Sequence, residues 1–182
     1  LEVNTAWDLG WAGWWDETCI RFFQVYGWEI RIIDYWEWNW FSMIDIIKNQ
    51  ILEKPYRYGY HLAPHDIKVH EYSTWKTRFN TALSMGLRFD VVGSISVSDG
   101  IDKVRNIFSK CWFDQNKCKK WLSALANYQR ERDTYMWNFR DKPLHNRASN
   151  GADAFRMLAV GFKSNENIKD HKSQSVSYDE FL

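Results

Sequence analysis

The chain has 182 residues and a formal net charge of +1, from 24 Lys and Arg against 23 Asp and Glu. This length predicts one compact domain of mixed α and β structure, whose core needs neither disulfides nor a structural metal. The near-neutral charge argues against a polybasic protein that holds nucleic acid by bulk charge, and it leaves room for a local basic strip. No apolar run reaches the ~20 residues of a membrane helix and no signal peptide opens the chain, so we expect a soluble protein.

The first three predicted strands form an antiparallel meander. They cover Val3–Leu9, Thr18–Tyr26 and Glu29–Glu37. The dipeptide Gly27-Trp28 has the spacing of a tight hairpin turn. A helical period of apolar residues follows over Phe41–Glu53, and Pro55 ends that helix.

The rest of the chain alternates strands and helices, which indicates parallel pairing. The predicted strands are Tyr58–Leu62 and Leu87–Val92, with a short extended piece at Tyr135–Phe139. The predicted helices are Lys76–Met85, Val97–Lys110, Lys117–Tyr128 and Ser149–Phe162. We expect the domain to cover residues 1–162 and the polar residues 163–182 to form a flexible tail.

Three aspartates lie at the ends of predicted elements. Asp8 leaves the first strand, Asp66 follows the fourth, and Asp153 lies in the first turn of the last helix. If strand four lies beside strand one, the three carboxylates converge at one edge of the sheet, where they repel one another unless a divalent cation binds. Three Asp suit a pair of Mg²⁺ ions roughly 3.5–4 Å apart, the arrangement of two-metal phosphoryl transfer. Alternatively, these residues only cap a helix or form turns.

Six short strings bear on this choice. In chain order they are Thr5–Gly10 (TAWDLG), Ile30–Tyr35 (IRIIDY), Pro64–Asp66 (PHD), Cys111–Asp114 (CWFD), Asp141–His145 (DKPLH) and Gly151–Arg156 (GADAFR). Together they resemble the C-terminal nuclease domain of tailed-phage terminase large subunits, over about Ala6 to Phe162. That family has an RNase H-like α/β fold, so the resemblance implies a mixed sheet, an antiparallel three-strand meander plus parallel strands, flanked by helices.

The resemblance also implies a function. It is metal-dependent cleavage of concatemeric double-stranded phage DNA during packaging. Asp8, Asp66 and Asp153 map onto the family's metal-binding triad, and Asp16 resembles an acidic residue that some members add beside the metals. The implied cofactors are two Mg²⁺ or Mn²⁺ ions, one to activate water and one to stabilise the leaving 3′ oxygen. The implied partners are double-stranded DNA, the portal protein, the small terminase subunit and an N-terminal ATPase domain absent from this chain. The implied location is the host cell cytoplasm, not the virion.

Two segments depart from the family's pattern. The Trp-rich stretch 11–15 stands where members often carry a small or polar loop, and Asn146 and Asn150 replace residues that could assist at the site. Asn cannot shuttle a proton as His can, although water activation by a metal does not require it. The triad is complete, and these departures leave room for reduced activity.

Basic residues gather between Lys110 and Lys142, where a solvated helix face explains most of them. Arg140, Lys142 and His145, in or beside the fifth string, are candidates for contacts with DNA phosphates. Such contacts would bind the backbone without reading sequence, and the binding would depend strongly on salt.

Other motifs are less specific. His61, His65 and His70 have spacings that could suit zinc, but Pro64 interrupts them and separate loop or surface histidines are favoured. Residues 73–77 end like a Walker A loop without its glycines, so we expect no ATP site. Three cysteines with no C-x-x-C pair support neither a disulfide framework nor a zinc ribbon and fit a reducing cytosol. The chain starts without Met, and we expect a fragment of a longer protein.

The chain is unusually aromatic, with 12 Trp. We expect Trp7 and Trp112, inside the family-like strings, to lie in the core. A second group in loop-like segments is expected to be partly exposed, and comprises Trp11, Trp14, Trp15, Trp38 and Trp40. Two alternatives to the packaging nuclease therefore stay open. One is a Holliday-junction resolvase or RNase H on the same fold, and the other is a docking module whose exposed Trp engage the portal, the small subunit or the motor domain.

Overall fold

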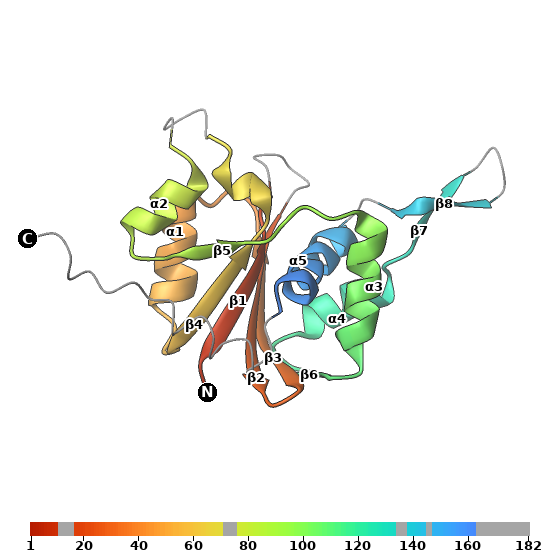
Figure 1. The fold of residues 1–182 in the computed structure, drawn as a ribbon, viewed down its shortest axis with the longest axis horizontal. Coiled ribbons are helices and arrows are strands. Elements are labelled where there is room, and N and C mark those ends of the chain that lie inside the picture. Colours follow the sequence, from red (N-terminus) through yellow and green to blue (C-terminus); the bar gives the residue numbers. More distant parts are fainter. Residues whose placement is uncertain (11–16, 71–75, 134–137, 145–146, 163–182) are drawn as a thin grey trace, which may run out of the picture.

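A six-stranded mixed sheet forms the centre of the molecule (Figure 1). The computed structural model describes residues 1–10, 17–70, 76–133, 138–144 and 147–162, with the backbone alone at 133, 138, 141, 142, 147 and 148. The strands of this sheet are β1 (Val3–Asp8), β2 (Thr18–Tyr26), β3 (Glu29–Trp38), β4 (Tyr58–Ala63), β5 (Phe89–Val91) and β6 (Cys111–Phe113). Their order is β5-β4-β1-β2-β3-β6.

The pairing of the five predicted strands of this sheet agrees with the prediction. Strands β1, β2 and β3 form the antiparallel meander, turned at Gly27 with φ +57°. Strand β4 lies parallel to β1, β5 parallel to β4, and β6 parallel to β3. The predicted mixed sheet is therefore confirmed, including the position of strand four beside strand one.

Helices cover both faces of the sheet (Figure 1). One face carries α1 (Met43–Ile46), which continues as the π-helical η1 (Ile47–Leu52), and α2 (Arg78–Ser84). The other face carries α3 (Val97–Phe108), α4 (Lys119–Ala126) and α5 (Arg147–Gly161). A short 3₁₀ helix, η2 (His65–Lys68), follows β4, and a separate antiparallel pair, β7 (Arg130–Asp133) and β8 (Asn138–Pro143), projects beyond α3. No described helix is long and apolar enough to span a bilayer.

The alternation of side chains along β1 divides the core in two. Trp7 is fully buried among the residues under α1, η1 and α2. Its ring is perpendicular to that of Phe89, with the ring centroids 5.1 Å apart. Ala6 points to the opposite face, into the cluster formed with Phe155 and Leu158 of α5. Because side chains in a strand alternate, Asp8 lies on the same face as Ala6, the face covered by α5. The prediction that Trp7 is a core residue is confirmed.

Serine and threonine side chains start the helices that the sequence predicts. The side chains of Ser42, Thr77 and Ser96 accept hydrogen bonds from the backbone N–H three residues on, at the beginnings of α1, α2 and α3. Gly86, with φ +82°, follows the end of α2. The predicted helix over 41–53 is correct in place but not in type, because its second half has π-helical hydrogen bonding.

One short strand of the central sheet was missed by the sequence analysis. Strand β6 was not predicted, and it forms by pairing Ile30–Ile32 with 111–113, a distant contact that leaves no local pattern in three residues. Of the extended piece expected at Tyr135–Phe139, the last two residues lie in β8, which pairs with β7, and residues 134–137 lie outside the described structure.

The prediction that Trp112 lies in the core was also wrong. Its side chain is 64% exposed. Trp112 lies on the edge strand β6 beside Arg31, which is exposed as well, on a part of the sheet that α1 and α2 do not cover. In contrast, Trp38 and Trp40 are 52% and 65% exposed, as expected. Trp11, Trp14 and Trp15 lie outside the described residues.

Candidate functional site

The topology brings Asp8 and Asp66 to the same edge of the sheet. Asp8 is the last residue of β1. Its parallel neighbour β4 ends at Ala63, and Pro64 leads directly into η2, which carries Asp66. The buried Ile67 fixes η2 against the core, and Oδ1 of Asp66 is shielded from solvent. Two carboxylates from separate parts of the sequence thus lie beyond the carboxyl ends of adjacent parallel strands, where α/β folds bind ligands.

Asp153 belongs to α5, the helix that packs across β1, β2 and β4. Ala154, Phe155 and Leu158 enter the core beneath this helix. Asp153 lies about 100° around the helix from Ala154, on the flank of that buried face. Its carboxylate is ion-paired with Nη1 of Arg156 at 3.1 Å.

The position of Asp153 within α5 differs from the prediction. The helix begins at Arg147, earlier than the expected Ser149, and no acidic residue lies in its first turn. The effect of a helix dipole on a charge is confined to the first turn. A capping or dipole role, the structural alternative for this aspartate, therefore does not fit Asp153.

The described side chains do not form a ready-made metal site. No group of three or more His, Cys, Asp or Glu among them is arranged to hold a metal ion. The donor type nevertheless suits Mg²⁺ or Mn²⁺, which prefer carboxylate oxygens. The ion pair between Asp153 and Arg156 is of the i,i+3 kind and is largely buried, so a cation bound to Asp153 would compete with Arg156 for its carboxylate. The donor chemistry of these carboxylates therefore fits a divalent ion.

A buried arginine beneath α5 was not predicted. Arg21 of β2 is fully buried, and its Nη2 donates a hydrogen bond to the carbonyl of Gly151, two residues before Asp153. Its guanidinium carbon lies 3.7 Å from the ring centroid of Trp121 and 5.3 Å from that of Phe155. Burial lowers the pKa of Arg21 to about 10, so the group stays charged at neutral pH. Arg21 therefore links the centre of the sheet to the helix that carries Asp153.

Polar groups surround Arg21 on the same face of the sheet. The phenol of Tyr35 donates a hydrogen bond to Glu37, and Glu37 also forms an ion pair with Lys120 of α4. Cys19, the strand partner of Asp8, lies within 3.4 Å of the Tyr35 hydroxyl. Burial raises the pKa of the Cys19 thiol, and the negative charge of Asp8 raises it further, so Cys19 is a protonated, unreactive thiol. The sequence feature that could have predicted this network is Arg21 itself, the single charged residue in the apolar stretch Thr18–Tyr26.

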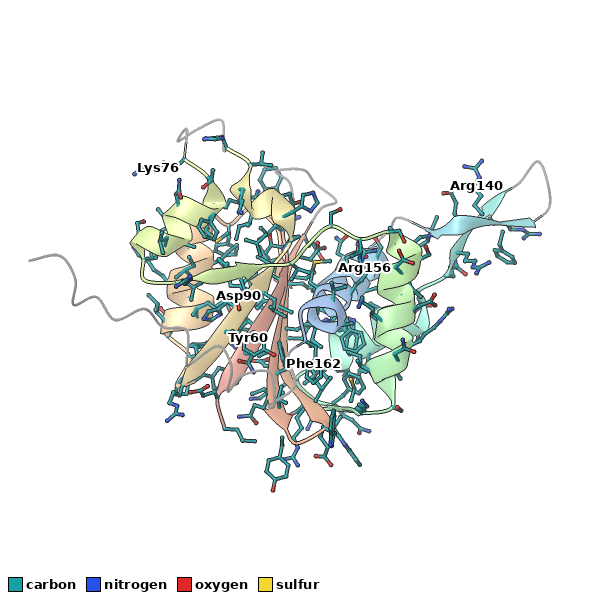
Figure 2. The ribbon with its side chains drawn as sticks, viewed as in Figure 1. Tyr60, Lys76, Asp90, Arg140, Arg156 and Phe162 are labelled. Atoms are coloured by element: carbon teal, nitrogen blue, oxygen red, sulfur yellow. The ribbon has the colours of Figure 1, made fainter. Side chains whose placement is uncertain are left out.

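The basic candidates of β8 are not brought to the edge that carries Asp8 and Asp66. Arg140 lies on β8, away from the central sheet (Figure 2), and pairs with Glu131 at 3.1 Å. Lys142 also lies in β8, where only the backbone is described. Asp16, His145 and Asn146 fall outside the described residues, whereas Asn150 is buried in α5.

His61 corrects the prediction of separate loop or surface histidines. It is buried in β4, and its Nδ1 lies 2.7 Å from Oγ1 of Thr5. Burial lowers its pKa from 6.5 to about 4, so it is neutral at physiological pH. His65 and His70 are exposed. The three histidines therefore occupy different environments. All three cysteines are free thiols.

Comparison with known proteins gives matches at the level of structure. No protein-family model and no curated protein sequence matches the chain. Among solved structures, the chain is similar to the P22 large terminase nuclease domain, with a TM-score of 0.63 and 18% identity over 87% of this chain and 80% of that one. It is also similar to the large terminase nuclease domain of bacteriophage SPP1 with bound Mn, with a TM-score of 0.59 and 12% identity over 87% and 85% of the two chains.

A longer relative shows how much of such a protein the chain represents. The large terminase of a thermophilic bacteriophage matches with a TM-score of 0.63 and 12% identity over 87% of this chain. The match covers 39% of that terminase, so the chain spans about two fifths of its length. At these identities the likeness concerns the fold. The chain has the RNase H-like fold of the large terminase nuclease domains, as its six strings predicted.

Proposed function

We propose that this chain is the divalent-metal-dependent endonuclease domain of a DNA-packaging terminase large subunit and that it cleaves double-stranded phage DNA. The observation that carries the proposal is the placement of Asp8 and Asp66 at one edge of a terminase-nuclease fold, with the helix of Asp153 packed against the same strand. The Mn bound to the similar SPP1 domain supports the choice of metal.

In this proposal, Asp8, Asp66 and Asp153 hold two Mg²⁺ or Mn²⁺ ions, with Asp16 as an additional carboxylate. Bound ions supply activation of water and stabilisation of the leaving 3′ oxygen. The chain itself supplies position. The parallel pairing of β1 and β4 fixes Asp8 relative to Asp66, and Arg21 holds the Gly151 carbonyl and with it the turn that presents Asp153. Arg140, Lys142 and His145 are proposed to contact DNA phosphates further from the carboxylates.

Cleavage of supercoiled plasmid tests the proposal. With Mn²⁺ or Mg²⁺ the wild-type domain should nick and linearise the plasmid, and EDTA should stop it. Asp8→Asn and Asp153→Asn should each reduce the cleavage rate by more than ~10–100-fold, the usual effect of removing a residue that only hydrogen-bonds to a metal ligand. The reduction is larger because each substitution removes a charged ligand itself. Asp99→Asn, an exposed aspartate of α3, is the matched control and should cleave as the wild type does. Full cleavage by either triad variant would overturn the mechanism.

The substrate separates this proposal from a resolvase or an RNase H on the same fold. A panel of duplex DNA, four-way junction and RNA–DNA hybrid should show preference for duplex DNA. A preference for the junction or for the hybrid would favour the respective alternative, with the same carboxylates.

A docking module is the second candidate, favoured by the exposed Trp38 and Trp40 at the end of β3. Its proposed partners are the portal protein, the small terminase subunit and an N-terminal ATPase domain, all acting in the host cell cytoplasm. Wild-type protein that binds portal yet stays inert with both metals would support docking over cleavage.

A further inference from the structure

A cavity of about 690 Å³ lies between α3, α5 and the base of the β7–β8 pair. This volume falls within the ~300–1,000 Å³ of ordinary small-ligand sites. Asp153 and Arg156 of α5 both line it, so it adjoins the proposed metal-binding carboxylate. Figure 2 shows Arg156 on the side of α5 that faces α3. A molecule in this cavity would therefore lie next to the proposed reaction centre.

The lining combines three guanidinium groups with the carboxylates of Asp102 and Asp153 and with apolar and aromatic surface, so cationic groups outnumber anionic ones by one. Arg105 of α3, Arg130 of β7 and Arg156 of α5 converge on it. Arg105 and Arg156 are ion-paired with Asp102 and Asp153, with Nη1 of the two arginines 2.9 and 3.1 Å from a carboxylate oxygen, respectively. A guanidinium carries five N–H donors, and a carboxylate accepts from two of its nitrogens in a bidentate pair, so an ion-paired arginine still has donors for a phosphate. The apolar part of the lining includes Ile101, Val104, Phe108, Leu125 and Pro143.

Phe108 supplies an aromatic ring at this cavity. It is 44% exposed, although its ring also meets Phe113 and Phe155 at centroid distances of 5.9 and 6.2 Å. Part of the ring is thus fixed by the core and part is open to a ligand. Aromatic rings held beside cationic side chains are the usual platform for the bases of single-stranded nucleic acid.

Gly100 makes room for Arg156. A Cβ atom at position 100 would overlap Cγ and Cδ of the arginine, whose stem lies across α3 at this point. Glycine in the middle of a helix costs stability relative to alanine. Here it allows Arg156 to lie between α3 and α5 with its guanidinium in the cavity wall.

We propose that this cavity binds one unpaired nucleotide of the DNA strand, with its phosphate on Arg105, Arg130 and Arg156 and its base stacked on Phe108. The proposal rests on the nuclease function proposed above and adds a strand-binding site to it. The nucleotide is unpaired because a base inside a duplex is covered on both faces by its neighbours and cannot reach a side-chain ring. Duplex DNA would therefore be held more tightly where an end or a frayed segment offers a free strand.

Fluorescence anisotropy in EDTA, where no cleavage occurs, tests the proposal. The probes are a labelled blunt duplex and the same duplex with a single-stranded overhang. The wild-type domain should bind the overhang probe more tightly. Phe108→Ala should reduce this preference about fivefold or more, the effect of losing one stacked base. Arg105→Gln should lower the slope of log Kd against log salt by about 0.7, because one contact to a single-strand phosphate is lost.

Matched controls lie outside the cavity lining. Phe41→Ala removes an aromatic ring that is 46% exposed, and Arg57→Gln removes an exposed arginine paired with Glu2. Neither should change the preference or the salt slope. Thermal unfolding checks the fold of each variant. If Phe108→Ala fails to fold, Arg105→Gln alone tests the proposal, because Arg105 lies on the exposed surface of α3.

The proposal is overturned if the wild type binds both probes equally, or if Phe108→Ala and Arg105→Gln both behave as the controls do. Plasmid cleavage by the wild type together with either result would leave the nuclease function intact and remove only the strand-binding site. A wild-type domain that does not cleave plasmid but keeps the overhang preference would support the strand-binding site and contradict the nuclease function.

Discussion

Arg21 of β2 joins the centre of the sheet to α5. Burying a guanidinium is unfavourable unless its charge and donors find partners. Here the Gly151 carbonyl accepts one hydrogen bond and the ring of Trp121 covers the group at 3.7 Å. Nε and Nη1 are buried without a hydrogen-bond acceptor among the described residues, so the aromatic faces provide much of the compensation. A single charged residue in an apolar strand predicts a buried polar network. The sequence does not show which distant backbone group accepts its hydrogen bond.

His61 gives the fold a pH dependence at the residue scale. Because burial lowers its folded-state pKa from 6.5 to about 4, the unfolded chain binds the proton more tightly. The stability contributed by neutral His61 is complete above pH 6.5 and is lost as the pH falls from 6.5 to about 4. A shift of this size corresponds to about 3 kcal/mol in the free energy of unfolding. Urea unfolding measured across this pH range checks the loss.

His61→Gln is the control for that prediction, because glutamine does not titrate and can still meet Thr5. The difference between the wild-type and variant curves removes the contribution of carboxylates, including Asp90, whose charge opposes the lowering of the His61 pKa. Two parallel curves between pH 6.5 and 4 would show that the histidine is not buried as described.

At the scale of the element, α5 shows how tertiary packing overrides local signals. Ser149, Asn150 and Gly151 suggest a helix start, yet all three are buried inside a helix that begins at Arg147. Their small or polar side chains fit the close approach of α5 to the sheet. The sequence therefore predicts that this helix exists and that it carries Asp153, but not where it begins.

Gly151→Ala tests how tightly α5 is seated. A Cβ at this position would lie 2.7 Å from Cδ1 of Trp121 and 3.1 Å from the Tyr35 hydroxyl. The added methyl group overpacks this site at a cost of about 1–3 kcal/mol, whereas replacing glycine by alanine in a helix gains about 1 kcal/mol. The free energy of unfolding should therefore fall. Gly93→Ala, with nothing within 4 Å of its Cβ, should be close to neutral in the same urea titration. A Gly151→Ala protein more stable than the wild type would contradict this packing.

Short strands mark the limit of what local patterns predict. The hairpin at Gly27 and the helix over residues 41–53 are predicted from patterns of neighbouring residues, a turn dipeptide in the first case and a helical period of apolar residues in the second. Strand β6 is three residues long and exists only because it pairs with Ile30–Ile32. The error at Trp112 follows from this, since its exposure depends on which strand forms the sheet edge and which helix covers it.

At the scale of the whole molecule, the order of strands makes the candidate site. Alternation of strands and helices predicts parallel neighbours, and parallel neighbours bring Asp8 and Asp66 to one edge although they are 58 positions apart in the sequence. The string GADAFR suggests Asp153 as the third carboxylate and gives it an arginine three residues on, but the position of the Arg156 side chain against α3 could not be predicted, because it depends on the space left by Gly100. A net charge of +1 is compatible with such a molecule, in which acidic and basic groups meet at the helices beside the site.

The central claim is that Asp8, Asp66 and Asp153 form one divalent-metal site. A crystal structure of the domain with Mn²⁺, with the metal located by anomalous diffraction, tests it most directly. The account predicts anomalous peaks bounded by these three carboxylates, with Asp153 turned away from Arg156 to meet the metal. Manganese bound elsewhere on the domain, with Asp153 still paired to Arg156 and no peak between Asp8 and Asp66, would contradict it.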